Sequence, residues 1–176
     1  MGNGSDPQTD IGPLIHEKAW VRVRSHVEDA LAKGAVLHCG GRRLEFPEPN
    51  RGYFFQPTLF DRVCPEMRIM QEETFGPVLT LTRFSTEAQA IAEANSTAYG
   101  LVAYGFTRDL GRAYRLVEQL EFGTIGINET LIVAPHLPFG GLKESGIGKE
   151  NGSEGLDEYL DLKSAVVRLP EERVPQ

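Results

Sequence analysis

Residues 78–128 read VLTLTRFSTEAQAIAEANSTAYGLVAYGFTRDLGRAYRLVEQLEFGTIGIN, and the spacing of their apolar residues switches repeatedly between that of a strand and that of a helix. In VLTLTRF, apolar residues alternate with threonine, as they do in a half-buried strand. Strand and helix patterns follow one another in the order 78–84, 86–95, 101–107, 110–120 and 124–128. This order is typical of a parallel sheet with helical crossovers. We therefore predict an α/β fold with a parallel αβα sheet and right-handed connections.

Both helices of this stretch are preceded by residues that cap helix N-termini. Thr86 stands three residues before Gln89, which is the spacing of a capping box. Asp109 can cap the second helix with its carboxylate. The apolar residues of this second helix recur on one face, at Leu110, Ala113, Val117 and Leu120. The sequence thus predicts where both helices begin and which side of the second one packs.

Other elements are expected on both sides of this stretch. A helix is predicted over 16–33, with Gly34 at its C-terminus. The run YFFQPTLF, 53–60, is extended, and Pro57 argues against a fully paired central strand there. The remaining predicted elements are a strand over 35–39, a short helix over 153–160 and a strand, SAVVRL, over 164–169. This last strand needs a partner from another part of the chain or from another subunit.

The composition is that of an ordinary globular domain. The chain has 176 residues, a length that fits one domain. Its net charge of −7 argues against a nucleic-acid partner. No apolar run approaches the roughly 20 residues that span a bilayer, so no membrane partner is expected. The two cysteines, Cys39 and Cys64, predict free thiols in a reducing compartment. The four histidines show no metal-binding spacing, so no metal site is predicted.

The stretch QEETFGPV, 71–78, combines two carboxylates with an aromatic residue and a Gly-Pro pair. A carboxylate can accept two hydrogen bonds from a ribose diol, and a nearby aromatic ring can face a planar heterocycle. The Gly-Pro pair restricts the chain where it enters the next strand. A solvated glutamate pair beside a core phenylalanine explains the same residues, and from the pattern alone both interpretations stay open.

Residues 138–152, PFGGLKESGIGKENG, contain five glycines in fifteen positions. This density indicates tight turns or close approach of backbone segments. The spacing does not match a P-loop, and no strand and helix flank it as a dinucleotide fingerprint requires. A flexible surface loop is the alternative, although Pro138 and Phe139 are unusual residues for a loop tip.

Three motifs in the same order, EETFGPV, FGTIGIN and PFGGLKESGIGKENG, resemble the C-terminal part of the NAD(P)-dependent aldehyde dehydrogenases. The resemblance extends from about residue 4 to about residue 169, and its subgroup is that of the succinate-semialdehyde dehydrogenases. It implies that residues 1–176 form the C-terminal portion of the family's catalytic domain, with an oligomerisation strand over 163–170. The implied partners are an aldehyde substrate, NAD or NADP, and further copies of the same subunit. The implied location is the cytoplasm, with the mitochondrial matrix as an alternative.

The resemblance also implies roles for individual residues. Glu73 would bind the ribose on the nicotinamide side of the cofactor, and Phe75 would pack near the nicotinamide. Asn128 would lie by the catalytic pocket, and Phe139 would line the aldehyde channel. Glu150 would help to relay protons from the general base.

The sequence departs from the family pattern in two respects. The family's nucleophilic cysteine, general-base glutamate, oxyanion asparagine and Rossmann domain precede the matching region, and neither Cys39 nor Cys64 stands in the nucleophile's place. We therefore expect an oxidoreductase fragment that is inactive alone. The semialdehyde subgroup usually has a serine before the PFGG motif, and here Val133 and Ala134 lie in that neighbourhood, which puts succinate semialdehyde in doubt as the substrate.

Two other functions are compatible with the same sequence. One is a non-catalytic interaction module that pairs with full-length aldehyde dehydrogenase subunits through its last strand. The other is a different enzyme that uses Cys39 or Cys64 as a nucleophile.

Overall fold

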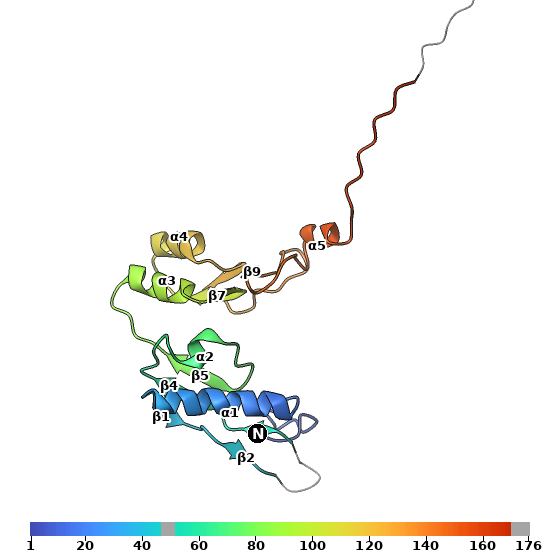
Figure 1. Cartoon of the computed structure of the whole chain (residues 1–176). Helices are drawn as coiled ribbons and strands as arrows, with labels where there is room; N and C mark the ends of the chain where they lie inside the picture. The colour runs from blue at the N-terminus through green and yellow to red at the C-terminus, as the bar shows by residue number, and fades with distance from the viewer. Residues whose placement is uncertain (47–51, 170–176) are drawn as a thin grey trace, which may run out of the picture. The chain divides into compact units, whose positions relative to one another are not determined.

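The computed structural model of the protein describes residues 1–46 and 52–169. The chain forms two compact units, and the boundary between them in the sequence lies between Thr97 and Ala98. Figure 1 labels the elements. The first unit contains α1 (Glu17–Ala32), β1 (Val36–Cys39), β2 (Arg43–Leu44), β3 (Phe54–Phe55), β4 (Thr58–Asp61), α2 (Arg68–Gln71), β5 (Val78–Leu81) and α3 (Glu87–Asn95). The second unit contains β6 (Tyr99–Gly100), β7 (Val102–Gly105), α4 (Leu110–Gln119), β8 (Thr124–Ile127), β9 (Leu142–Lys143) and α5 (Glu154–Asp157).

The main sheet of the first unit has the strand order β1-β4-β5. β1 is antiparallel to β4, and β4 is parallel to β5. As the argument from Pro57 predicts, the run 53–60 is not one fully paired central strand: it is divided at Gln56 and Pro57 into β3 and β4, and only β4 lies in the middle of this sheet. The proline therefore precedes the paired strand, where its missing N–H removes no hydrogen bond from the ladder.

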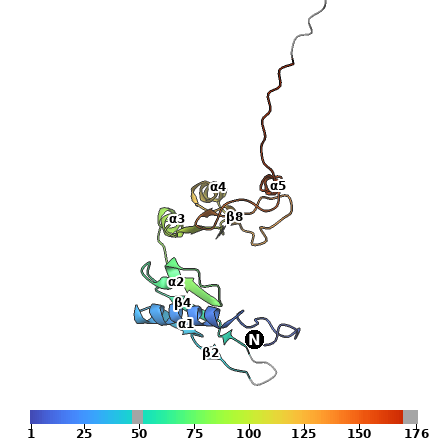
Figure 2. The same cartoon turned by 45° about the vertical axis from the view of Figure 1, so that its right-hand side comes forward.

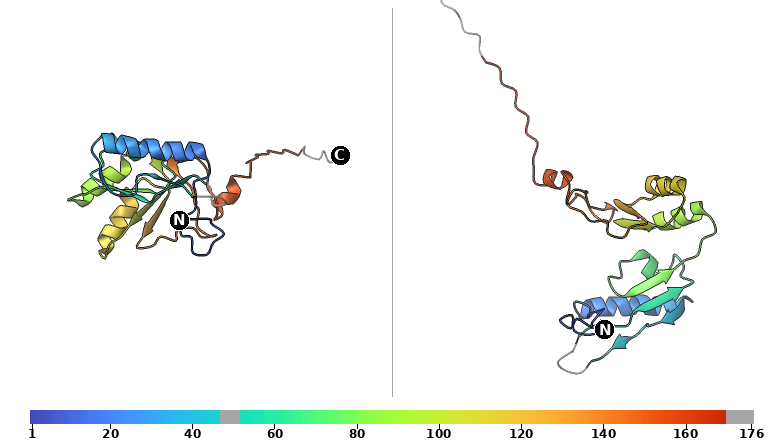
Figure 3. Two further views of the ribbon diagram at one scale, coloured as in Figure 1. Left: turned by 90° about the horizontal axis from the view of Figure 1, so that it is seen from below. Right: turned by 180° about the vertical axis from the view of Figure 1, so that it is seen from behind.

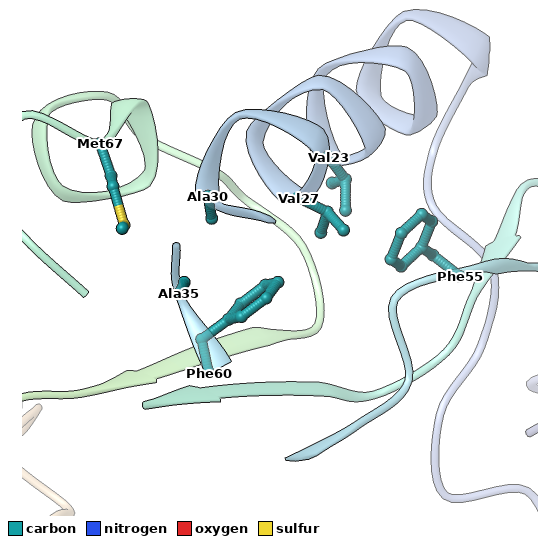
Figure 4. Packing of buried hydrophobic residues seen from close by; sticks show 7 residues of the cluster. All are labelled: Val23, Val27, Ala30, Ala35, Phe55, Phe60 and Met67. Atoms are coloured by element: carbon teal, nitrogen blue, oxygen red, sulfur yellow. The ribbon is translucent and has the colours of Figure 1, made fainter. Parts of the chain in front are cut away.

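The core of the first unit lies between α1 and the sheet. Val23, Val27 and Ala30 of α1 pack with Phe55 and Phe60 from the strands, and Ala35 and Met67 complete the cluster (Figure 4). α1 runs alongside β4 in two views of the chain (Figures 1 and 2). The helical spacing of these residues on α1 explains why the predicted helix over 16–33 forms here.

The helix signals in the sequence correspond to real caps. The Thr86 hydroxyl accepts a hydrogen bond from the Gln89 N–H at 3.2 Å, and the Asp109 carboxylate accepts one from the Arg112 N–H at 2.7 Å. Gly34, which follows α1, has a φ of +90°. The predicted boundaries of α1, α3 and α4 are therefore confirmed to within about a residue. Among the helices that the structure describes, none is long and apolar enough to cross a membrane.

The second unit contains two pairs of strands. β7 and β8 are parallel, with Val102 opposite Thr124, and β6 and β9 are antiparallel. The predicted alternation of strands and helices over 78–128 is present, with β5 paired in parallel with β4 in the first unit and β7 paired in parallel with β8 in the second. Hydrophobic spacing identifies strands but not their neighbours, which depend on contacts far apart in the sequence. The α/β class itself is confirmed.

The end of the chain differs from its predicted secondary structure. α5 is shorter than the helix predicted over 153–160. Residues 160–169 form no strand and run as an extended segment (Figure 3), with Val166 99% exposed. A strand requires a neighbour to hydrogen-bond with, and the described part of this chain supplies none. Pairing of 163–170 with another subunit stays a prediction, and its last residue lies outside the described ones.

Phe60 offers a direct test of this core. Its side chain is fully buried, whereas Leu79 on neighbouring β5 is 62% exposed. We expect Phe60→Ala to lower the free energy of unfolding by about 3–5 kcal/mol, because it removes a buried ring and leaves a cavity. The matched variant Leu79→Ala should change it by about 0.5 kcal/mol or less. Urea unfolding followed by circular dichroism measures both, and equal effects would contradict the packing described here.

Candidate functional site

Glu72 is held by charged and polar side chains on both sides. The Arg68 guanidinium donates two hydrogen bonds to its carboxylate, from Nε and Nη2, each 2.8 Å long. The Nε2 atom of His26 lies 3.1 Å from the same carboxylate. These contacts, with Arg68 the larger cause and His26 the second, lower the pKa of Glu72 to about 2. Glu72 therefore joins α1 to the segment that leads into β5.

Thr74, two residues further along, is held by the same helix. Its hydroxyl lies 3.0 Å from Nδ1 of His26, and its carbonyl accepts a hydrogen bond from Nε of Arg22 at 3.2 Å. Gly76 lies so close to α1 that a Cβ atom at this position would overlap Cγ2 of Val23. The Gly-Pro pair thus serves a close approach of the backbone to the helix.

Glu73 and Phe75 point away from these attachments. Glu73 is exposed, and its carboxylate has no hydrogen-bond or ion-pair partner among the described residues. Phe75 is 72% exposed and has a φ of +46°, which is rare for a bulky residue. The interpretation of Phe75 as a core residue is therefore wrong. The segment presents a carboxylate with unused acceptor sites beside an exposed aromatic ring.

Asn128 lies directly after β8 in the second unit. Its side-chain oxygen accepts a hydrogen bond from the Thr107 N–H at 2.8 Å, and its side-chain nitrogen donates one to the Thr107 carbonyl at 2.7 Å. Its φ is +55°, a conformation that asparagine tolerates better than most residues. The amide thus joins the ends of β7 and β8, and each of its polar atoms keeps capacity for one further hydrogen bond.

Phe139 and Glu150 are brought together by an antiparallel bridge. Each donates its backbone N–H to the other's carbonyl, and both hydrogen bonds are 2.7 Å long. Residues directly opposite one another in an antiparallel pair have their side chains on the same face. The half-buried Phe139 ring and the exposed Glu150 carboxylate therefore share one face of this bridge.

The glycines around this bridge allow backbone segments to lie against one another. A Cβ atom at Gly123 would overlap the Gly140 carbonyl oxygen, and one at Gly140 would lie only 2.5 Å from the Gly148 oxygen. Gly148 also has a φ of +84°, in the left-handed region that favours glycine. The prediction of tight turns and close backbone approach in 138–152 is confirmed.

The predicted site residues belong to two units, with Glu73 and Phe75 in the first and Asn128, Phe139 and Glu150 in the second. Sequence reasoning missed the residues that hold the first pair in place, which are Arg22, His26, Arg68 and Thr74. No local signal identifies Arg22 and His26, because they lie 52 and 46 residues away from their partners Thr74 and Glu72. The spacing of Arg68 and Glu72, four residues apart, is a local signal that could have found that pair. Within residues 1–46 and 52–169, no group of three or more His, Cys, Asp or Glu side chains is placed to hold a metal ion.

The model of the aldehyde dehydrogenase family matches residues 1–165. The chain belongs to this family. It is 47% identical over 163 residues to the succinate semialdehyde dehydrogenase of Acinetobacter baylyi, covering 93% of this chain and 33% of the relative. It is 46% identical over 169 residues to the NADP(+) succinate-semialdehyde dehydrogenase of Escherichia coli, covering 96% of this chain and 34% of that enzyme.

Solved structures of the family have the same fold. The NAD+ complex of an aldehyde dehydrogenase from Bacillus cereus superposes with a TM-score of 0.87 at 36% identity, over 94% of this chain and 33% of that one. The chain therefore spans about a third of the length of the relatives that it matches. The resemblance to the C-terminal part of this family is confirmed, and the chain is a fragment relative to these enzymes.

The pKa of Glu72 leads to a prediction for acid unfolding. Its folded value of about 2 is below its ordinary value of 4.5, so its ion pairs stabilise the fold fully above pH 4.5 and progressively less as the pH falls toward 2. We expect Glu72→Gln to unfold at a lower urea midpoint than the wild-type chain at pH 7. Near pH 2 the urea midpoints of the two chains should be nearly equal. Other acid-titrating groups are common to both chains and cancel in the difference. A difference between the two chains that does not change with pH would contradict the ion pairs.

Proposed function

We propose that this chain is the C-terminal portion of an NAD(P)-dependent enzyme that oxidises an aldehyde to a carboxylic acid. The observation that carries the proposal is the segment 72–75, in which Glu72 and Thr74 are tied to α1 while Glu73 and Phe75 are exposed. A ribose diol donates two hydrogen bonds, and a carboxylate with two uncommitted oxygens can accept both. The residues present therefore fit the nicotinamide ribose of NAD or NADP.

In this proposal Glu73 accepts hydrogen bonds from the ribose and so orients the ring attached to it. Phe75 offers its aromatic ring to the nicotinamide. The cofactor, when bound, supplies the acceptor for the hydride that leaves the substrate. The protein's contribution here is orientation, which governs the rate because a small misplacement of the reacting atoms slows the reaction greatly.

In the second unit, we assign Phe139 to the lining of the aldehyde channel and Glu150 to proton relay. The reciprocal hydrogen bonds between these residues support the assignment, since they place an apolar ring and a carboxylate on one face. Asn128 lies by the same pocket in this proposal and holds the end of β8 through its contacts with Thr107.

For the substrate, we propose succinate semialdehyde as the first aldehyde to test, because the Acinetobacter and E. coli relatives are named for it. Val133 and Ala134 offer no side-chain donor for a substrate carboxylate. If the substrate is acidic, its carboxylate must therefore be held by other groups of the enzyme.

The two thiols of this chain are poor candidates for the nucleophile. Cys39 directs its thiol at the Pro57 carbonyl, 3.8 Å away. The Cys64 thiol hydrogen-bonds to the Glu66 carboxylate, which lowers the pKa of Glu66. We therefore propose that the chain needs the rest of an aldehyde dehydrogenase for turnover.

A second candidate function is an interaction module for full-length aldehyde dehydrogenase subunits. It is favoured by the exposed apolar side chains near the end of the described chain, which are Leu156, Tyr159, Leu160, Leu162, Val166, Val167 and Leu169. Exposed apolar residues gathered in one segment indicate a binding surface. In this view the segment adds to another subunit as a strand, and the complete enzyme is a homo-oligomer.

A complementation assay separates the two candidates. We expect no aldehyde oxidation by the 176-residue chain with either NAD+ or NADP+, and activity when it is mixed with the upstream two thirds of the E. coli relative. Assembly with full-length subunits that changes their oligomeric state without restoring activity would favour the interaction module. Turnover by the chain alone, abolished by mutating Cys39 or Cys64, would contradict both.

The role of Glu73 is testable in a chimera that joins this chain to the upstream two thirds of the E. coli relative. Glu73→Gln keeps one acceptor but loses the charge. We expect cofactor binding to weaken by about 1.5–3 kcal/mol and single-turnover hydride transfer to slow. Glu28→Gln, on the exposed side of α1, is the matched control and should change neither. Unchanged hydride kinetics in Glu73→Gln would overturn the assignment.

A further inference from the structure

His26 is fully buried in α1 and yet uses both of its ring nitrogens outside the helix. Nε2 reaches the Glu72 carboxylate and Nδ1 reaches the Thr74 hydroxyl, at 3.1 Å and 3.0 Å. A carboxylate only accepts hydrogen bonds, so Nε2 carries a proton and donates it. The threonine hydroxyl can donate to Nδ1 or accept from it, so this contact is satisfied whichever form Nδ1 takes.

The two partners of His26 are residues i and i+2 of one segment, which flank Glu73. Glu72 has extended backbone angles, with φ −112° and ψ 149°. In an extended chain, residues i and i+2 face the same side and the residue between them faces the other. A ring that binds both Glu72 and Thr74 therefore directs Glu73 away from α1.

The conformation of Phe75 depends on the same attachments. A left-handed backbone at a bulky residue is unfavourable and persists only where its surroundings impose it. Here Thr74 is attached to His26 and Arg22 on one side of Phe75, and Gly76 lies against Val23 on the other. All of these contacts come from one face of α1.

We propose that His26 is a positioning residue for the cofactor, which holds Glu72 and Thr74 so that Glu73 and Phe75 face the nicotinamide ribose. This inference rests on the proposed role of Glu73. His26 itself touches neither cofactor nor substrate in this scheme. Its ring is the bridge between a helix and a segment that lies 46 to 48 residues further along the chain.

Two variants with a side-chain amide test the two contacts of the imidazole separately. His26→Gln places a nitrogen near the position of Nε2 and keeps the contact with Glu72, whereas His26→Asn places one near Nδ1 and keeps the contact with Thr74. His26→Ala removes both contacts. Glu28→Gln on the exposed side of α1 is the matched control. The amide variants also keep the test open if His26→Ala does not fold.

In the chimera described above, we expect His26→Ala to raise the KM for NAD(P)+ about tenfold and to slow hydride transfer, with the KM for the aldehyde unchanged. His26→Gln and His26→Asn should each give a smaller effect. In the Glu73→Gln background His26→Ala should add less than about threefold, because the group that it positions has lost its charge. A purely structural role would instead raise both KM values and act equally in either background, and this result would overturn the inference.

Hydrogen exchange on the 176-residue chain provides the second measurement, which needs no activity. We expect His26→Ala to speed exchange at the amides of residues 73–75 while the β4 amides stay protected, and Glu28→Gln to change neither. Unchanged exchange at 73–75 would overturn the positioning role by itself. Unchanged cofactor binding and hydride transfer in the Glu73→Gln chimera, together with faster exchange in His26→Ala, would instead show that Glu73 does not bind the cofactor although His26 does hold the segment.

Discussion

The packing of α1 against β4 and against the segment 72–76 organises the first unit. Val23, Val27 and Ala30 bring one face of the helix onto the sheet, and His26 lies on this same face. A polar ring is tolerated there because both of its nitrogens have partners. One helix face thus supplies the apolar core and also holds the segment that carries the proposed cofactor contacts.

The second unit depends on its backbone rather than on a core. Among its described residues, no large apolar side chain is buried, and its close contacts include the β7–β8 ladder, the bridge between Phe139 and Glu150, and the approach of Gly123 to Gly140. Parallel strands normally need cover on both faces. This exposure is what a piece of a larger domain shows, in agreement with a chain that spans a third of its relatives.

Local features of the fold were predictable from the sequence. The caps at Thr86 and Asp109 depend on residues three positions apart, so the starts of α3 and α4 could be read directly. Strand partners could not, because β4 and β5 are joined by contacts that no local spacing encodes. The segment 163–169 is the clearest case, since a strand exists only once a neighbour has been supplied.

The sequence by itself determined the α/β class, the boundaries of α1, α3 and α4 and the membership of the family, because periodicity, caps and the three motifs are all local. The family resemblance also singled out Glu73 and Phe75 as candidates, whereas the residue pattern alone does not separate Glu73 from its neighbour Glu72. Only the tertiary structure decided that Glu72 is bound by Arg68 and His26 while Glu73 stays uncommitted. The physical reason is that adjacent residues of an extended segment face opposite sides, and which side meets α1 is set by packing between residues far apart in the chain.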